Sequence, residues 1–293
     1  MGKSGASGTR ERYRAGIDPY DCRNDGLGQA FGSDDDAMQT TLVQALVDAR
    51  RQGTQILKHR AIGTPANEEE ACLTMLEVAG QLAWEPLGWK IAATNAEMQR
   101  RLRTTAPVLG RTFRRFLLHS PAVISHEGLL DPVVECEFFF RMGRELPVNR
   151  GGHTREQVVD CIASVHVGIE VAECRLAFNP PPDPLQVMAD GYASGRYVMG
   201  PALPDWQAAL EAPMAVVLEK NGAERARGSS SEVMGNPVNA VVWLANRLSG
   251  LGVPLARDEI ISSGSCTGMV RAKAGDRMLA RFGQYGTVEV AFD

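Results

Sequence analysis

The chain has 293 residues, of which 44% are hydrophobic and 23% charged, an ordinary composition for a folded protein with a sizeable core. Its formal net charge is −4 and its lysines and arginines form no dominant block, so the sequence shows no basic region of the kind that binds nucleic acid. No apolar run approaches the roughly 20 residues that span a bilayer, and no secretory signal pattern opens the chain, so we expect a cytoplasmic protein with a small-molecule partner and no membrane partner.

The first part of the chain differs in composition from the rest. Residues 1–35 are rich in Gly, Ser, Asp and Arg with little apolar periodicity, which predicts a flexible N-terminal extension. Residues 36–293 show no internal repeat and no linker, and predict a single domain. The six cysteines are scattered without CxxC pairs, as expected for free thiols in a reducing compartment.

Helical spacing of apolar residues, together with capping residues and charged ends, predicts several helices. They run from Asp36 to Arg51, from near Asn67 to before Pro86, from Thr94 or Asn95 to Arg103, from Thr154 to about Ser164, and from Pro237 to about Leu248.

Short runs of β-branched and aromatic residues predict strands between these helices. They are 87–92, 113–118, 122–124, 133–140, 165–171, 197–199, a hairpin built on 214–219 around Asn221-Gly222, 259–262 and 286–292. Pro107 and Gly110 are interpreted as chain breaks, and residues 180–184 as a proline-rich loop. Many short strands with helices on their flanks indicate an α+β fold.

The central strand, residues 133–140, carries two carboxylates within an apolar run. Because side chains of a strand alternate between faces, Glu135 and Glu137 share one face. The opposite face is apolar and belongs in a core; it consists of Val134, Cys136, Phe138 and Phe140. Like charges at this spacing repel unless a cation lies between them, which favours a metal ion. Taken alone, the strand is equally compatible with a solvated acidic face.

A third carboxylate lies in the next apolar strand, where Glu170 shares a face with His166 and Gly168. Three carboxylates with no His or Cys at ligand spacing describe an oxygen-ligand site suited to Mg²⁺ or Mn²⁺. Their charge exceeds that of the ion, so a nearby cation is needed. Lys90, in the strand before the acidic one, is our candidate to restore the balance and to move a proton.

Five short motifs occur in the order found in one known family. They are Gly88-Trp89-Lys90-Ile91, Val134-Glu135-Cys136-Glu137-Phe138, Gly168-Ile169-Glu170-Val171, Ala189-Asp190 with Ser194-Gly195, and Ser263-Gly264-Ser265-Cys266-Thr267-Gly268. From about residue 40 onwards the chain resembles the 2-keto-4-pentenoate hydratase and 4-oxalocrotonate decarboxylase family of the fumarylacetoacetate hydrolase superfamily. Two features depart from the pattern, namely Tyr192 in the turn after Asp190 and the N-terminal extension.

The resemblance implies a mixed β-roll with flanking helices and a homo-oligomer. It implies a divalent metal held by Glu135, Glu137 and Glu170. It also implies that Lys90, Asp190 and Ser194 surround a 2-oxo acid, with Lys90 or Asp190 moving the proton. Burial that shifts the lysine pKa toward neutrality would help that role.

The reaction implied is hydration of 2-hydroxypenta-2,4-dienoate, or a substituted relative, to a 4-hydroxy-2-oxo acid. The alternatives are decarboxylation of 2-oxo-3-hexenedioate, C–C hydrolysis of an acylpyruvate, and a non-catalytic partner subunit. Decarboxylation requires an extra cationic pocket, for which Arg111, Arg114 and Arg115 are candidates. His166 is interpreted as a structural histidine, and Cys266 as a pocket or turn residue rather than a nucleophile.

Overall fold

The computed structural model describes residues 41–293. The predicted extension, residues 1–35, and the first residues of the helix predicted from Asp36 lie outside this part. The described α-helices are α1 (Leu42–Gln52), α2 (Glu68–Leu82), α3 (Ala96–Leu102), α4 (Arg155–Val159), α5 (Pro184–Ala189), α6 (Trp206–Ala209) and α7 (Pro237–Gly250). None of these helices is long and apolar enough to cross a membrane.

Two mixed sheets account for the strands of residues 41–293. The larger sheet has the order β2-β1-β10-β5-β6-β7-β3, with β11 also paired to β5, and the smaller has the order β4-β13-β12-β8-β9. The larger sheet consists of β1 (Pro86–Ala92), β2 (Val108–Phe113), β3 (Leu117–His119), β5 (Val133–Met142), β6 (Ile162–Ala172), β7 (Arg196–Ala202), β10 (Ile260–Ser262) and β11 (Val270–Arg271). The smaller sheet consists of β4 (Ala122–Ile124), β8 (Ala215–Lys220), β9 (Ala223–Ser229), β12 (Arg277–Phe282) and β13 (Thr287–Phe292).

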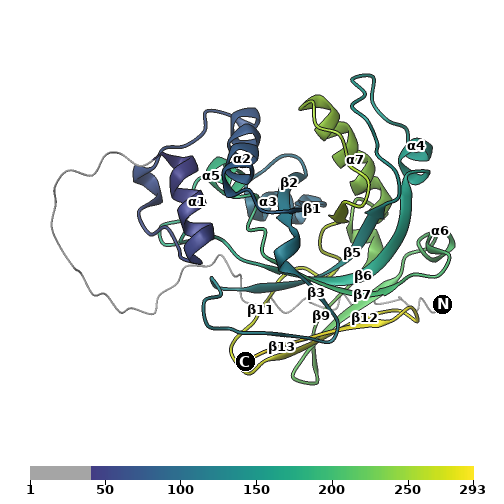
Figure 1. The fold of residues 1–293 in the computed structure, drawn as a ribbon. Helices are drawn as coiled ribbons and strands as arrows, with labels where there is room; N and C mark the ends of the chain where they lie inside the picture. Colours follow the sequence, from purple (N-terminus) through teal and green to yellow (C-terminus); the bar gives the residue numbers. More distant parts are fainter. Residues whose placement is uncertain (1–40) are drawn as a thin grey trace, which may run out of the picture.

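The long, curved strands β5, β6 and β7 form the middle of the molecule (Figure 1). Strands β12 and β13 lie on one side of them, and helices α1, α2, α3, α5 and α7 on the other (Figure 1). The predicted apolar face of β5 belongs to the main core, where Phe138 packs edge-to-face on Phe282 of β12 with ring centroids 5.4 Å apart. The opposite face of β5 is also buried, so its glutamates are turned into the protein rather than into solvent.

Local capping signals predicted most of the helices correctly. The Asn67 side chain caps α2, Asn95 caps α3, and Pro237 opens α7. Helix α1 begins at Leu42, because the extended Thr41 is its N-cap. The helix predicted from Thr154 to Ser164 has the expected capping box, but it ends at Val159. Strand β6 takes up its second half, because pairing with β5 buries the β-branched residues.

Three predictions for strands and loops are wrong. A single strand was predicted over 113–118, but this segment contains three elements. Strand β2 ends at Phe113, a short 3-10 helix follows over Arg114–Phe116, and β3 begins after it. Residues 180–184 are not entirely loop, since Pro184 is the first residue of α5. Gly110, interpreted as a chain break, lies within β2. A glycine is required there because a Cβ on Gly110 would lie 2.1 Å from the carbonyl oxygen of Gly191.

We expect Gly110→Ala to destabilise the protein by about 1–3 kcal/mol, the usual cost of an overpacked position. The added methyl would collide with backbone rather than with a flexible side chain. The matched control is Gly80→Ala in α2, where nothing lies within 4 Å of the new Cβ. There the replacement is expected to stabilise by about 0.5–1 kcal/mol. Urea unfolding of both variants tests this, and equal free energies of unfolding would contradict it.

Candidate active site

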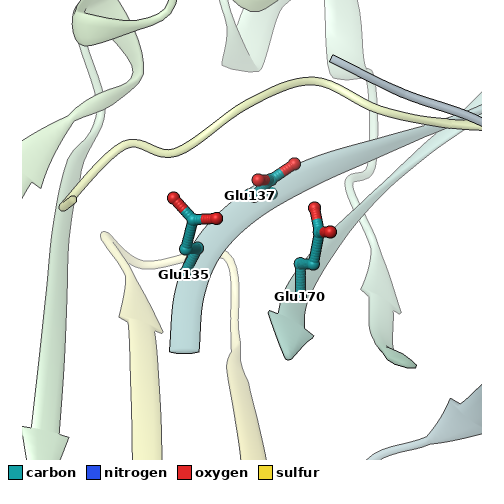
Figure 2. A group of neighbouring side chains, drawn as sticks. All are labelled: Glu135, Glu137 and Glu170. Atoms are coloured by element: carbon teal, nitrogen blue, oxygen red, sulfur yellow. The ribbon is translucent and has the colours of Figure 1, made fainter. Parts of the chain in front are cut away.

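Three buried glutamates meet on one face of the larger sheet. Strands β5 and β6 pair antiparallel with Glu135 opposite Glu170, and Glu137 follows two residues along. Figure 2 shows their carboxylates rising from the same side of the two adjacent strands. One oxygen from each lies within 4.8 Å of the others, and the residues are 6%, 1% and 0% exposed for Glu135, Glu137 and Glu170 respectively. The structure therefore brings together all three predicted metal ligands.

The hydrogen bonds around this cluster leave one oxygen unsatisfied. Glu137 Oε2 accepts from the hydroxyl of Ser262 and, at 2.8 Å, from the backbone N–H of Gly264. Glu170 Oε1 accepts from the Tyr197 hydroxyl at 3.3 Å. Glu170 Oε2 is buried without any partner among the described residues. An unpartnered buried carboxylate oxygen is costly unless a cation or a donor meets it, and it points to a ligand.

Electrostatics gives a second reason for a cation here. Two like charges about 4 Å apart repel by about 4 kcal/mol at an effective dielectric constant of about 20. Burial raises the pKa of Glu135 to about 7; the charge of Lys90 acts to lower this pKa, and the charge of Glu170 acts to raise it. Burial, with the charges of Glu170 and Glu135, raises the pKa of Glu137 well above its usual value. The donor set is entirely carboxylate oxygen, which fits a hard divalent ion such as Mg²⁺, Ca²⁺ or Mn²⁺.

Lys90 provides the cation that was expected beside the cluster. Its Nζ lies 2.9 Å from Glu170 Oε1 and donates to the Tyr192 carbonyl oxygen at 2.9 Å. Burial acts to lower the pKa of Lys90, but Glu170, Glu135 and Glu137 outweigh it and raise that pKa above its usual value. In the structure, therefore, burial does not move this pKa toward neutrality, and Lys90 holds its proton.

The cluster opens into a cavity of about 320 Å³. Lys90, Glu135 and Glu137 line one part of it. Most of the remaining wall is apolar. It comes from α3, the segment 178–187, the turn 190–195 and the segment that follows β10. Apolar residues of this wall include Met98, Leu102, Phe178, Val187 and Met269. This is the usual arrangement of a small-molecule site, in which a few polar groups converge within an apolar wall.

Asp190 and Ser194 do not line this cavity. Asp190 is fully buried, and both of its carboxylate oxygens accept from Arg175 Nε at 3.0–3.1 Å. Arg50 Nη2 lies 3.0 Å from Asp190 Oδ1, and Arg175 Nη2 donates to the Ser194 carbonyl oxygen at 2.8 Å. The structure thus places Asp190 between two arginines behind the turn 190–195, rather than beside the acidic cluster.

Ser194 is connected to the cluster through one tyrosine. Its Oγ lies 3.0 Å from the Tyr197 hydroxyl, which donates in turn to Glu170. Tyr197 was predicted only as a strand residue, and nothing in the local sequence reveals its contact. Arg50 and Arg175 also had no local signal, because their partner lies far away in the chain.

Several secondary predictions can be checked in the same region. The proposal that Arg111, Arg114 or Arg115 supplies a cationic pocket is wrong for this cavity, since none of them is among its lining residues. Arg111 pairs with Glu259, Arg114 pairs with Glu85, and Arg115 stacks on Trp84. His166 is structural, as predicted, with its ring nitrogens bonded to Ser164 Oγ and the Gly200 carbonyl oxygen.

Cys266 is a buried turn residue, as predicted. Its backbone N–H donates to the Cys136 carbonyl oxygen at 2.8 Å, and burial raises the pKa of its thiol well above the usual value. A thiol in this state is a poor nucleophile.

Comparison with known proteins agrees with this geometry. Residues 93–292 match the family model of the fumarylacetoacetate (FAA) hydrolase C-terminal domain. The chain therefore belongs to the fumarylacetoacetate hydrolase family, and the predicted mixed β-roll with flanking helices is confirmed.

Within this family the chain is similar to hydratases. It is 31% identical to a 2-keto-4-pentenoate hydratase of Paraburkholderia xenovorans (strain LB400) over 211 residues, which are 71% of this chain and 76% of the relative. It is also 31% identical to a 2-hydroxyhexa-2,4-dienoate hydratase of Comamonas testosteroni over 223 residues, which are 75% of this chain and 82% of the relative.

A solved structure shares the fold. The 4-oxalocrotonate decarboxylase from Pseudomonas putida G7, complexed with magnesium and adipate, superimposes with a TM-score of 0.79. The match covers 86% of this chain and 96% of that one at 24% sequence identity.

Proposed function

We propose that this protein is a divalent-metal-dependent hydratase that converts 2-hydroxypenta-2,4-dienoate, or a substituted relative, to the corresponding 4-hydroxy-2-oxo acid. The observation that carries the proposal is the buried triad Glu135, Glu137 and Glu170, with its unpartnered oxygen, beside Lys90 at a cavity. The similarity to two hydratases that act on 2-oxo or 2-hydroxydienoic acids supports it. A cytoplasmic homo-oligomer is part of the proposal.

Glu135, Glu137 and Glu170 would hold Mg²⁺ or Mn²⁺, because their oxygens match the preference of these ions. When bound, the ion supplies a Lewis acid that stabilises negative charge on the C2 oxygen of a 2-oxo acid. Ser262 and the N–H of Gly264 keep the Glu137 carboxylate in one orientation. Such partners of metal ligands usually contribute to metal affinity as well.

Lys90 is the proposed proton-transfer group. Hydration needs a proton at C5 of the dienol to give the enone, then water at C4 and a proton at C3. The protonated Nζ of Lys90 lines the cavity and is fixed by the Tyr192 carbonyl and by Glu170. It can therefore deliver a proton to substrate carbon, and once deprotonated it can accept one from water.

Asp190 and Ser194 are proposed as positioning residues. Asp190 and its two arginines hold the turn 190–195, which provides the Tyr192 carbonyl that orients Lys90. Ser194 holds Tyr197 against Glu170. Of the two residues predicted to move the proton, Lys90 and Asp190, we therefore propose Lys90.

The experiment is to remove metal with a chelator, restore Mg²⁺, and follow 2-hydroxypenta-2,4-dienoate and 2-oxo-3-hexenedioate separately by NMR. We expect magnesium-dependent formation of 4-hydroxy-2-oxopentanoate from the first compound. Glu170→Gln is expected to lose both Mg²⁺ binding and turnover. The matched control Glu173→Gln, which removes a carboxylate that pairs with Arg196, is expected to retain both.

The other outcomes identify the alternatives. CO₂ release from 2-oxo-3-hexenedioate alone would contradict the hydratase and indicate a decarboxylase. Cleavage of an acylpyruvate alone would indicate a C–C hydrolase. Magnesium binding without turnover of any of these acids would indicate a non-catalytic partner subunit.

A further inference from the structure

The cavity at the candidate active site is larger than a five-carbon 2-oxo acid requires. Its volume is about 320 Å³. A cavity of about 150 Å³ holds one benzene molecule, so this cavity is about twice that size. A five-carbon acid bound at the acidic cluster therefore leaves room for about four more carbon atoms. The chemistry of the remaining wall decides which substituent can occupy that room.

The cavity has a closed polar end and an open end. Lys90, Glu135 and Glu137 form the closed end, and they are 2%, 6% and 1% exposed respectively. Arg103 and Pro181 also line the cavity, but both are exposed, so they mark its mouth. Because the oxygens at C1 and C2 of a 2-oxo acid belong at the proposed metal site, the far end of the substrate extends toward the mouth.

Most of the wall outside the closed end is apolar. Helix α3 contributes Met98 and Leu102, α5 contributes Val187, and the turn 190–195 contributes Ala193. Each of these residues is buried or half-buried, so they belong to the packed protein around the cavity. An alkyl group gains free energy when it leaves water for such a wall, whereas a charged group loses free energy unless it finds a partner.

Two arginines also line the cavity, and each already has an interaction of its own. Arg103 donates from Nη2 to the Pro182 carbonyl oxygen at 2.6 Å, which joins α3 to the proline-rich segment. Arg101 is likewise engaged. A second carboxylate on the substrate would compete with these interactions for a partner, whereas an alkyl group needs none.

We propose that the substrate is a 2-hydroxydienoic acid whose C5 carries an alkyl group of about two to four carbons, the size that the cavity leaves room for. This group packs against Met98, Leu102 and Val187. The proposal deepens the proposed function and rests on it for the acid end of the substrate. It favours an apolar tail over a second carboxylate and over the unsubstituted five-carbon acid.

The test measures binding of saturated 2-oxo acids to the Mg²⁺-loaded protein by calorimetry, so it needs no turnover. From 2-oxopentanoate to 2-oxooctanoate the Kd is expected to fall by about 10- to 50-fold, as for burial of each added methylene. 2-Oxohexanoate should bind at least about tenfold more tightly than 2-oxoadipate, which has the same length but ends in a carboxylate. A Kd that stays constant beyond 2-oxopentanoate, or 2-oxoadipate that binds as tightly as 2-oxohexanoate, would overturn the proposal.

Val187→Thr tests the wall directly. Threonine has nearly the shape of valine but places a hydroxyl in the apolar wall, so the ratio of the Kd for pyruvate to that for 2-oxooctanoate should fall by about 3- to 10-fold. The control Val242→Thr makes the same change at a half-buried valine of α7 that does not line the cavity, and it should keep the wild-type ratio. An equal ratio in the two variants would contradict the proposed contact.

Failure of the proposed function gives a different result. A wild-type protein that turns over no dienoate, but whose affinity for 2-oxo acids rises with chain length, would contradict the hydratase and support the apolar tail site. A protein that hydrates 2-hydroxypenta-2,4-dienoate with a higher kcat/KM than 2-hydroxynona-2,4-dienoate, which carries a butyl group at C5, would support the hydratase and overturn the tail site.

Discussion

Lys90→Met is expected to lower kcat for 2-hydroxypenta-2,4-dienoate by about 10²- to 10⁴-fold, the contribution of a well-placed proton donor. Methionine keeps an unbranched side chain of similar length but carries no proton and no charge. The lysine Nζ is fixed at 2.9 Å from both Glu170 Oε1 and the Tyr192 carbonyl oxygen, and Lys90 lines the cavity, so its proton is held at one place in the cavity wall. Turnover in D₂O, with deuterium incorporation at C3 and C5 followed by NMR, measures the effect.

Metal binding separates loss of the proton donor from loss of the site. The variant removes a positive charge from beside three carboxylates, so its Mg²⁺ affinity should stay unchanged or rise. Calorimetric titration with Mg²⁺ and circular dichroism establish that the variant is folded and loaded. A kcat within about threefold of wild type, with normal deuterium incorporation, would contradict the role of Lys90 in proton transfer.

Arg175→Met is expected to lower the free energy of unfolding by about 3 kcal/mol, the lower end of the range for breaking a buried ion pair. The variant removes the side-chain donor to both Asp190 oxygens and the donor to the Ser194 carbonyl. The backbone N–H of residue 175 and the Arg50 guanidinium remain beside Asp190. Because the turn 190–195 loses these contacts, kcat should also fall. Urea unfolding monitored by fluorescence measures the stability change.

A second substitution tests the cause of the loss. Adding Asp190→Asn to Arg175→Met removes much of the unbalanced buried charge and should recover part of the stability. The control Arg141→Met removes a pair with Asp258 in which the side chains are 45% and 49% exposed, so it should cost about 1 kcal/mol or less. A stability of Arg175→Met within 1 kcal/mol of wild type would show that Arg50 alone balances Asp190.

The shared face of Glu135 and Glu137 on β5 could be predicted, because it depends only on the alternation of side chains along one strand. Glu135 and Glu137 point to one side of β5 as expected, and the apolar residues that alternate with them along the strand enter the core. The caps of α2 and α3 were equally local. Such features depend on residues a few positions apart, so one stretch of sequence contains all the information they need.

The features that were missed depend on distant residues. Gly110 appeared to be a chain break because its reason, the close approach of Gly191, lies elsewhere in the chain. The helix after Thr154 stopped early because pairing with β5 was stronger than helical propensity. The arginines around Asp190 had no pattern to reveal them, since a single charged residue is ordinary on a surface and only the fold makes it a buried partner.

The order of strands in the larger sheet has a consequence for the timing of synthesis. Strand β10, which lies late in the chain, is inserted between β1 and β5 and pairs with both. A nascent chain that has left the ribosome as far as β6 contains Lys90 and all three glutamates, but the strand that joins them in the sheet does not yet exist. Because a domain folds as a unit, the proposed site can close only after β10 has been synthesised. A prematurely terminated chain that lacks β10 should therefore neither retain the metal nor turn over substrate.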